Sequence, residues 1–367
     1  MSSKLYFRKL WAVALTAIAA MFLLLGFAAG TPDQDLSKDH PKVREVIDIQ
    51  ERATPALMSD EEVLGTAVGQ DDDGEIALHV FVNLEGKHVA DTIRNIPRNL
   101  GRTRVTVVLT EPFRALGGKP GPTAVSHTAE QSPPIQLGTS GGWRYDLANG
   151  YCCGGTLGAL IQIGGTKYIL SNYHVFESDI VAGGNGIIAQ TGDPIIQPGL
   201  IDLGCSDDNA QEVATLVRSS SPPNSNVDAS IAAVIPDMVR TDGAILEIGT
   251  ISAQTAAASL KQAVKKSGRT TRLTRSTISG LNATVSVAYD NECAGGEAFV
   301  KTFTGQILIA NRASKFLAGG DSGSLMVEDV ATNPRAVGLL FAGSSSIAVA
   351  NPIGQVLLFF GATMVGN

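Results

Sequence analysis

The C-terminal part of the chain consists of short apolar segments separated by clusters of Gly, Asn, Asp and Pro, and this pattern limits the fold more than any other feature. Such spacing is typical of the strands of a sandwich or barrel. Within this C-terminal part, only residues 352–360, which begin with a proline, have the pattern of a helix. We therefore predict a mostly β domain over residues 135–367, with strands at 155–163, 166–171, 186–191, 228–235, 261–266, 276–289, 297–310, 323–328, 335–343 and 346–351.

A smaller unit precedes this domain. Apolar residues at helical spacing predict a helix over residues 43–58, and a short helix is expected within 91–100. Strands are predicted at 63–69, 76–82 and 104–110. Residues 40–116 are therefore expected to form a small N-terminal α+β domain.

A segment rich in glycine and proline separates the two units. Residues 117–142 contain six glycines and four prolines, which neither a helix nor a central strand tolerates, and we place a linker at 117–134. The small domain before it is either a pro-segment that assists folding and is then removed, or an accessory domain that stays attached. An N-terminus of the active protein within residues 117–142 would indicate the pro-segment.

Residues 1–30 are predicted to direct export. Lys4, Arg8 and Lys9 form a positive flank before the apolar run at residues 10–29, as in a signal peptide. The run nearly reaches the length of about 20 residues that spans a bilayer, so it is either a cleaved signal peptide or a retained membrane anchor. Both alternatives place the rest of the chain in the periplasm or outside the cell.

Export permits disulfide bonds. The chain has four cysteines, and the adjacent Cys152 and Cys153 are expected to bond outward to Cys205 and Cys293, in an order that the sequence leaves open. No Cys and His spacing typical of a zinc site occurs, so neither a metal nor a cofactor is expected. The net charge of -7 argues against a nucleic-acid partner, because phosphate binding requires clustered cations.

A serine between glycines near the C-terminus is the first candidate for chemistry. In Gly319-Gly320-Asp321-Ser322-Gly323-Ser324, the glycines allow a sharp turn that exposes the Ser322 hydroxyl and directs the amides of Gly320 and Ser322 to one point. Ser322 is therefore the predicted nucleophile, and the two amides are the predicted oxyanion hole. The alternative for this hexapeptide is an ordinary hairpin turn.

A base and an orienting carboxylate are needed beside such a serine. Of the five histidines, His174 is the candidate because it follows the apolar strand at 167–171 and so lies at a strand end. Asp228 is the single charge before the apolar segment 229–234, so we expect it to be buried and to need a partner. The chain order His174, Asp228, Ser322 is that of a chymotrypsin-type triad.

At these residues the chain resembles the chymotrypsin-like serine peptidases, and most of all the bacterial branch that includes α-lytic protease and the streptogrisins. The resemblance extends over roughly residues 135–365. Beside Gly-Asp-Ser-Gly, the similar segments are Cys-Gly-Gly-Thr-Leu at 153–157, Lys-Ser-Gly-Arg-Thr-Thr at 266–271, 281–285 and 351–357. The resemblance implies two perpendicular six-stranded β-barrels, with the triad in the cleft between them.

The resemblance also implies where substrate binds. Residues 338–343 resemble the strand that pairs with the substrate backbone, so Phe341, Ala342 and Gly343 are expected to contact it. Phe316, six residues before Ser322, stands at the base of the primary specificity pocket and favours an apolar or small side chain at the cleaved residue. The linker lacks an Ile-Val-Gly-Gly segment, so no new N-terminus is expected to pair with Asp321.

These features together predict an exported serine endopeptidase that hydrolyses peptide bonds through a triad and an acyl-enzyme. Its partners would be protein or peptide substrates, with membrane contact only through residues 10–29. The alternative is a protease-fold binding protein without turnover. A fluorophosphonate would label a reactive Ser322 only in the first case.

Overall fold

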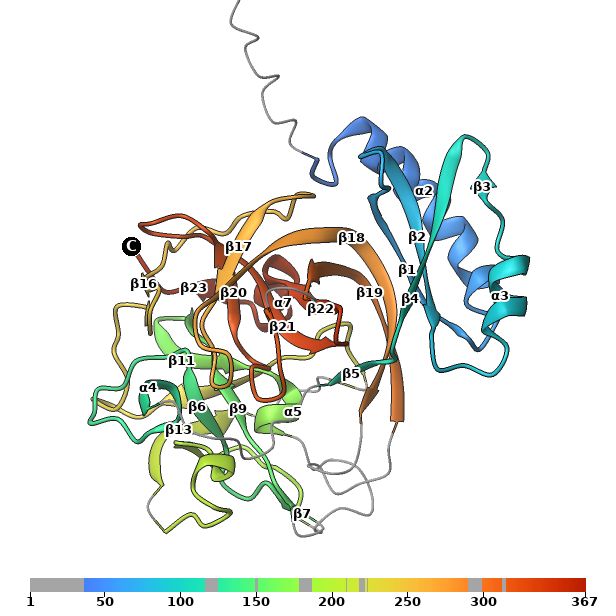
Figure 1. The fold of residues 1–367 in the computed structure, drawn as a ribbon. Coiled ribbons are helices and arrows are strands. Elements are labelled where there is room, and N and C mark those ends of the chain that lie inside the picture. Colours follow the sequence, from blue (N-terminus) through green and yellow to red (C-terminus); the bar gives the residue numbers. More distant parts are fainter. Residues whose placement is uncertain are drawn as a thin grey trace, which may run out of the picture. The chain divides into compact units, whose positions relative to one another are not determined.

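The computed structural model describes residues 36–115, 125–148, 151–177, 187–208, 210–217, 222, 224–289, 299–311 and 315–367. Two large sheets, of eight and eleven strands, make up most of this part (Figure 1). The predicted mostly β class is therefore confirmed. No helix within these ranges is long and apolar enough to cross a membrane, and the apolar run at 10–29 lies outside them.

The eight-stranded sheet has the order β23-β10-β11-β14-β13-β12-β6-β9, and all its neighbours pair antiparallel. The strand predicted at 186–191 does not form over 187–191, where Ile187 and Ile188 are exposed. The chain pairs a few residues later instead, because Ile195 and Ile196 are the side chains buried in the sheet. Its strands are β6 (Thr139–Trp143), β9 (Gly155–Leu157), β10 (Ala159–Ile163), β11 (Thr166–Ser171), β12 (Pro194–Gln197), β13 (Gln211–Val217), β14 (Ser230–Val234) and β23 (Thr363–Met364).

The second sheet contains six strands whose pairings close into a ring. β17 pairs with both β20 and β18, and the path from β20 to β18 runs through β21, β22 and β19. Apolar side chains from these strands form the core, including Val264, Ile309, Met326 and Leu340. The strands are β17 (Ala263–Lys266), β18 (Thr274–Tyr289), β19 (Phe299–Ala310), β20 (Leu325–Glu328), β21 (Ala336–Gly343) and β22 (Ile347–Pro352).

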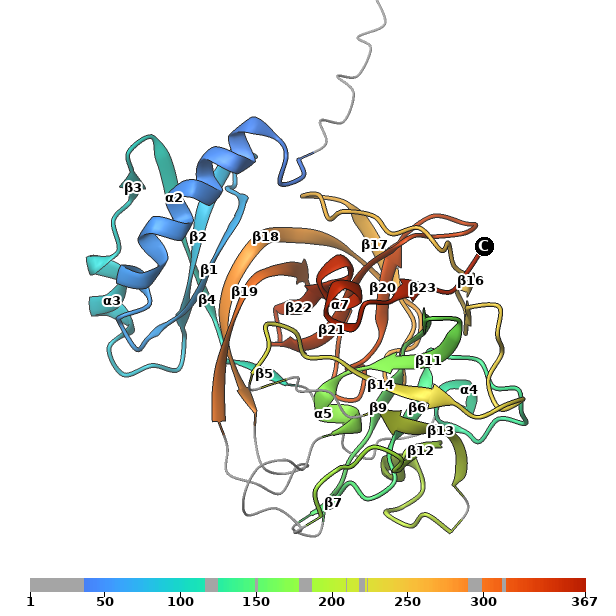
Figure 2. The ribbon, with the colours of Figure 1, turned by 180° about the vertical axis from the view of Figure 1, so that it is seen from behind.

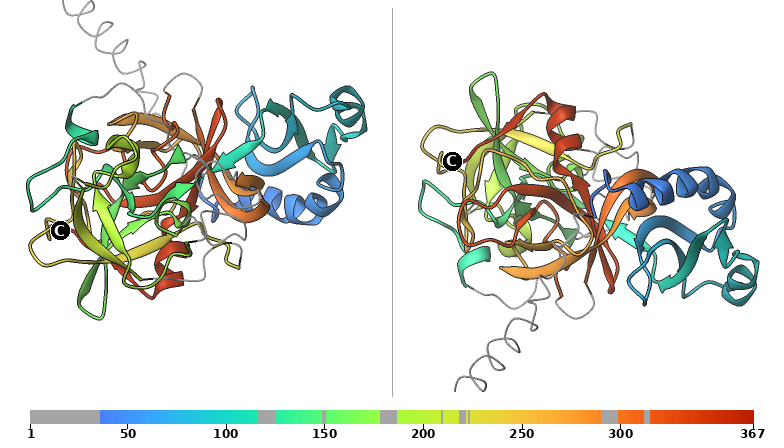
Figure 3. Two further views of the ribbon diagram at one scale, coloured as in Figure 1. Left: turned by 90° about the horizontal axis from the view of Figure 1, so that it is seen from below. Right: turned by 90° about the horizontal axis from the view of Figure 1, so that it is seen from above.

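The N-terminal segment extends this second sheet. Its elements are α2 (Pro41–Leu57), β1 (Val63–Gln70), β2 (Ile76–Asn83), α3 (Val89–Asn95), β3 (Asn99–Leu100), β4 (Thr103–Thr110) and β5 (Phe113–Ala115), close to the predicted ones. Helix α2 buries Val43 and Val46 against β1 and β2 (Figure 2). β1 pairs antiparallel with β18, so the small α+β segment and the C-terminal part share one sheet (Figure 3).

Shorter elements lie between these strands. Helix α7 (Ile353–Phe360) begins after Pro352, as predicted, and ends at Gly361, which has a left-handed backbone conformation. Helix α5 (Tyr173–Phe176) directly follows β11. The remaining elements are α4 (Val125–Thr128), β7 (Leu147–Ala148), β8 (Tyr151–Cys152), η1 (Leu200–Asp202), β15 (Ala244–Ile245) and β16 (Gly249–Thr250). The expectation that residues 117–142 hold neither a helix nor a central strand is therefore wrong. Helix α4 forms where residues 123–132 contain no glycine or proline, and β6 pairs with both β12 and β9.

Candidate active site

His174 and Asp228 meet because two neighbouring strands bring their flanking residues together. β11 and β14 pair antiparallel, with Ser171 opposite Ser230. The residues just after Ser171 and just before Ser230 therefore lie side by side. His174 Nδ1 is 2.7 Å from Asp228 Oδ2, and the two side chains are 10% and 0% exposed.

This contact determines which imidazole nitrogen can act as a base. An ionised carboxylate has no proton to donate, so Nδ1 of His174 carries the proton and donates it to Asp228. Nε2 is then the nitrogen with the free lone pair. It is buried and has no hydrogen-bond partner in the described part of the chain.

Asp228 is buried and held by several partners, as its position before an apolar segment predicts. Its backbone N–H donates to Asn351 Oδ1 at 2.9 Å, and Asn172 Nδ2 donates to its carbonyl oxygen at 2.7 Å. Tyr289 Oη donates to Oδ2 of the carboxylate at 2.7 Å. The carboxylate that faces His174 therefore has a fixed orientation.

Ser322 lies in a tight turn before β20. Gly320 and Gly323 have φ values of 92° and 90°, which explains the glycines around the serine. The turn packs against β9, because Thr156 donates its N–H to the Ser322 carbonyl at 2.8 Å and its Oγ1 to the Gly320 carbonyl at 2.9 Å. Two strands thus hold this turn, since Gly323 N–H also donates to the Leu340 carbonyl on β21 at 3.0 Å.

The expectation of an exposed Ser322 hydroxyl is wrong. Ser322 is fully buried between these strands, and its Oγ donates to the Phe341 carbonyl at 3.4 Å. The structure therefore brings His174 and Asp228 into direct contact and gives Ser322 a partner on β21. The roles of the Gly320 and Ser322 amides as an oxyanion hole stay predictions.

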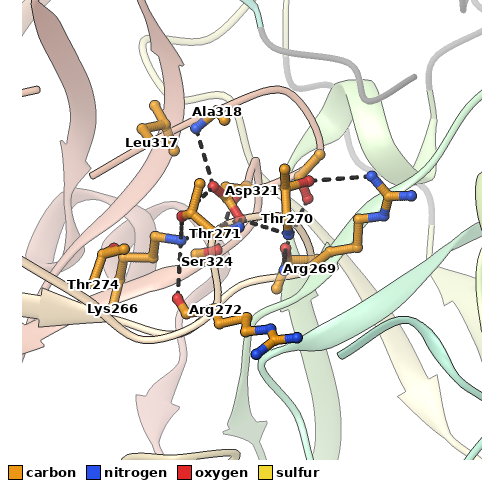
Figure 4. Close-up of polar contacts among 12 residues, drawn as sticks. Lys266, Arg269, Thr270, Thr271, Arg272, Thr274, Leu317, Ala318, Asp321 and Ser324 are labelled. Atoms are coloured by element: carbon orange, nitrogen blue, oxygen red, sulfur yellow. Dashed lines mark hydrogen bonds and ion pairs between the residues drawn. The ribbon is translucent and has the colours of Figure 1, made fainter. Parts of the chain in front are cut away.

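Figure 4 shows how Asp321, the residue before Ser322, is held. Its Oδ1 accepts the N–H groups of Thr270 and Thr271 at 2.9 and 3.1 Å. Its Oδ2 accepts Thr271 Oγ1 at 2.7 Å and the Ala318 N–H at 3.0 Å. Both carboxylate oxygens are thus saturated with donors from the segments on either side of the turn.

A buried lysine neutralises this carboxylate. Lys266 Nζ lies 3.1 Å from Asp321 Oδ1, and both side chains are fully buried. The ammonium also donates to Thr271 Oγ1 and, at 3.2 Å, to the Arg272 carbonyl, so all its N–H groups have acceptors. Burial lowers the pKa of Lys266, and the attraction of Asp321 offsets this only in part. The cation that pairs with Asp321 is therefore the side chain of Lys266, which lies inside the protein.

Lys266 and Tyr289 are the site residues that sequence reasoning missed. Lys266 is one of three lysines in the predicted strand 261–266, so it does not stand out as a single charge in the way Asp228 does. For Tyr289 the sequence holds no signal either, because a tyrosine at the end of a strand is ordinary. Only the packing of β18 shows its partner.

The predicted substrate-binding residues have definite positions. Phe341, Ala342 and Gly343 end β21, and its edge pairs with β5 through Ala342 opposite Ala115 and Gly343 opposite Arg114. Phe316 is fully buried in the apolar core of the second sheet. Its proposed role at the base of the specificity pocket stays a prediction.

One disulfide bond is described. Cys152 bonds to Cys205 across 53 residues, which confirms one outward pairing of the cysteine doublet. Cys153 is also disulfide-bonded, while Cys293 lies outside the described residues. Among the residues that the structure describes, no cluster of three His, Cys, Asp or Glu side chains is placed to hold a metal ion.

No protein-family model matches this sequence, and no curated protein matches it either. Among solved structures, the matches include bacterial proteases of the chymotrypsin-like type. A glutamic acid specific serine protease is 20% identical, covers 63% of this chain and 100% of its own, and has a TM-score of 0.41.

Two further structures are similar to the same extent. Protease A from Thermobifida fusca is 20% identical over 58% of this chain and 92% of its own, with a TM-score of 0.39. The chymotrypsin of Cellulomonas bogoriensis is 19% identical over 64% of this chain and 99% of its own, with a TM-score of 0.37. What these enzymes cleave is a property of those proteins.

Proposed function

We propose that this protein is an exported serine endopeptidase in which Ser322 is the nucleophile, His174 the base and Asp228 the group that orients the base. The observation that carries the proposal is the buried contact between His174 Nδ1 and Asp228 Oδ2, which leaves Nε2 as an unpaired base. Ser322, in a turn between glycines, supplies the hydroxyl. The closed ring of six strands in the second sheet agrees with one of the two expected barrels.

The chemistry follows from these groups. Ser322 Oγ attacks the peptide carbonyl while His174 Nε2 accepts its proton, and Asp228 stabilises the imidazolium that forms. The amides of Gly320 and Ser322 bind the oxyanion. Nε2 then gives the proton to the leaving amine, and an ester to Ser322 remains. Water hydrolyses this ester by the same route and restores the hydroxyl.

We propose further that residues 40–116 act as a pro-segment that blocks this site until it is removed. β5 pairs with Ala342 and Gly343, two of the three residues of β21 predicted to contact substrate, and it pairs in parallel with Val287 and Ala288 of β18. A substrate strand that adds to β21 would need the same edge. The accessory-domain alternative requires another site for substrate.

N-terminal sequencing of the active exported protein separates these alternatives. A pro-segment predicts a mature chain that begins within residues 117–142. Because the pro-segment is also expected to assist folding, it predicts that a chain starting at residue 133 is inactive, and that this chain regains activity when residues 31–116 are added in trans and then removed by proteolysis. An active chain that still contains residues 40–116 would show that the segment stays attached.

The test of the catalytic proposal is labelling of the exported protein by a fluorophosphonate, together with hydrolysis of peptide esters. Ser322→Ala and His174→Ala should each reduce kcat by about 10⁴ to 10⁶-fold, as expected for members of one catalytic unit. Ser345→Ala, an exposed serine near the end of β21, is the matched control. Normal folding without labelling or turnover would favour the binding-protein alternative. Retention of more than about a tenth of the activity by Ser322→Ala would refute the assignment.

A further inference from the structure

The carboxylate of Asp228 has a second donor besides His174. Tyr289 is the last residue of β18, and its Oη lies 2.7 Å from Asp228 Oδ2. The same oxygen accepts the His174 Nδ1 proton at 2.7 Å. One carboxylate oxygen is therefore shared between the imidazole and a phenol.

Aromatic packing places the phenol with little freedom. Tyr289 is 5% exposed, and its ring stacks on Phe299 with centroids 4.7 Å apart and planes 3° apart. Phe303 lies against it at 6.4 Å, and the ring meets the His174 imidazole edge-on at 6.1 Å and 71°. The hydroxyl therefore reaches Asp228 from a rigid side chain, at low entropic cost.

The phenol acts as a donor. Burial raises the pKa of Tyr289 well above its ordinary value of 10, and the nearby charge of Asp228 raises it further. The Tyr289 hydroxyl therefore keeps its proton at neutral pH, and the Asp228 carboxylate can only accept a hydrogen bond from it. A hydrogen bond to a charged group is stronger than one between neutral groups.

We infer that Tyr289 is a positioning residue for catalysis, which holds Asp228 Oδ2 toward His174 and draws part of its negative charge. The inference rests on the proposed function, because it concerns how the base is set. With the phenol in place, Asp228 stabilises the imidazolium less than a carboxylate without that donor would. Without it, the carboxylate carries more charge toward His174 and is also freer to rotate.

The groups that face this contact limit the interpretation of a pH profile. Asp228 is the charged partner of Tyr289, and Tyr173 on α5 is the other titratable residue that acts on it. His174 contacts the same carboxylate oxygen. Glu177, which follows α5, is buried and accepts a hydrogen bond from Ser230. These residues remain unchanged when only the Tyr289 hydroxyl is removed.

The experiment replaces Tyr289 by phenylalanine, which keeps the ring packing, and uses Tyr145→Phe as the control, a tyrosine whose ring contacts Trp143. We expect kcat/KM at the optimum to fall about tenfold, in line with the loss of a hydrogen bond to a charged group. We also expect the acid limb of the kcat/KM profile to move to higher pH. The control should change neither quantity.

Two further measurements keep the inference testable if Tyr289→Phe folds poorly. Site-specific 3-fluorotyrosine at position 289 keeps the shape and strengthens the donor, so the acid limb should move to lower pH. In the Ser322→Ala background, the NMR chemical shift of the His174 Nδ1 proton should change with either replacement of Tyr289 and should not change with Tyr145→Phe.

The outcomes separate the inference from the proposed function. A loss of activity with an unmoved pH profile and an unchanged Nδ1 signal would overturn the positioning role and leave Tyr289 as packing alone. If the unaltered protein neither hydrolyses esters nor is labelled at Ser322, the proposed function fails. The NMR comparison still decides in that case whether the phenol acts on the His174 and Asp228 pair.

Discussion

Replacing Lys266 by methionine removes the cation beside Asp321 and is expected to weaken both the fold and the turn that contains Ser322. Methionine has nearly the same length but no charge. Asp321 would then be a buried carboxylate without a counter-charge, directly before Ser322. If the Asp321 side chain turns toward solvent, the backbone amides on both sides of Asp321 move with it.

The contacts around Asp321 set the size of the effect. Removing one partner of a buried ion pair costs about 3 to 5 kcal/mol. Asp321 keeps four other donors, from Thr270, Thr271 and Ala318, so we expect the lower end of this range, about 3 kcal/mol. For a chain of this size that corresponds to a melting temperature lower by about 4 °C.

The assay compares melting temperatures and fluorophosphonate labelling rates of Lys266→Met with those of Lys265→Met. Lys265 is the matched control because, among the residues that the structure describes, its Nζ donates only to the Val330 carbonyl, at 2.7 Å, and pairs with no carboxylate. Adding Asp321→Asn to Lys266→Met should cost less than the sum of the single changes, since no unpaired charge is left. Equal effects of the two lysine variants, or additive effects in the double variant, would refute the reasoning.

Three other outcomes are expected. Gly320→Ala should lower kcat about 10² to 10³-fold, because Gly320 has a φ of 92° and a Cβ there would lie 2.6 Å from a side-chain oxygen, which would move a predicted oxyanion donor. Ester hydrolysis should be normal in the control Gly354→Ala, because a Cβ at Gly354 has nothing within 4 Å. A normal kcat for Gly320→Ala would contradict the predicted role of its amide. Replacing both Cys152 and Cys205 by alanine should destabilise the fold by about 4 kcal/mol, from the entropy of a loop of 53 residues; denaturant unfolding measures this, and an unchanged midpoint would argue against it. Burial lowers the pKa of His79 below its ordinary 6.5, so the unfolded chain binds the proton more readily. β1 and β2 should therefore be most stable above pH 6.5 and lose stability as the pH drops through that value. Amide hydrogen exchange should show this pH dependence, and His79→Gln should remove it.

The sequence alone determined the elements whose residues carry their own pattern. The predicted helix at 43–58 and the long strands at 276–289 and 297–310 correspond to α2, β18 and β19. Apolar periodicity and turn residues are local properties, so no tertiary information is needed to find them. Asp228 was found for a related reason, because a single charge beside an apolar strand must find a partner, and His174 is that partner.

The tertiary structure alone decided what depends on segments distant in the sequence. The pairing of β1 with β18 and of β5 with β21 joins the small α+β segment to the edge expected to bind substrate, and backbone pairing leaves no mark on side-chain pattern. The burial of Ser322 also depends on strands remote from its own turn, since β9 and β21 cover it. Lys266 and Tyr289 gain their roles from carboxylates 55 and 61 residues away in the chain, and only the folded core brings those charges within hydrogen-bond distance.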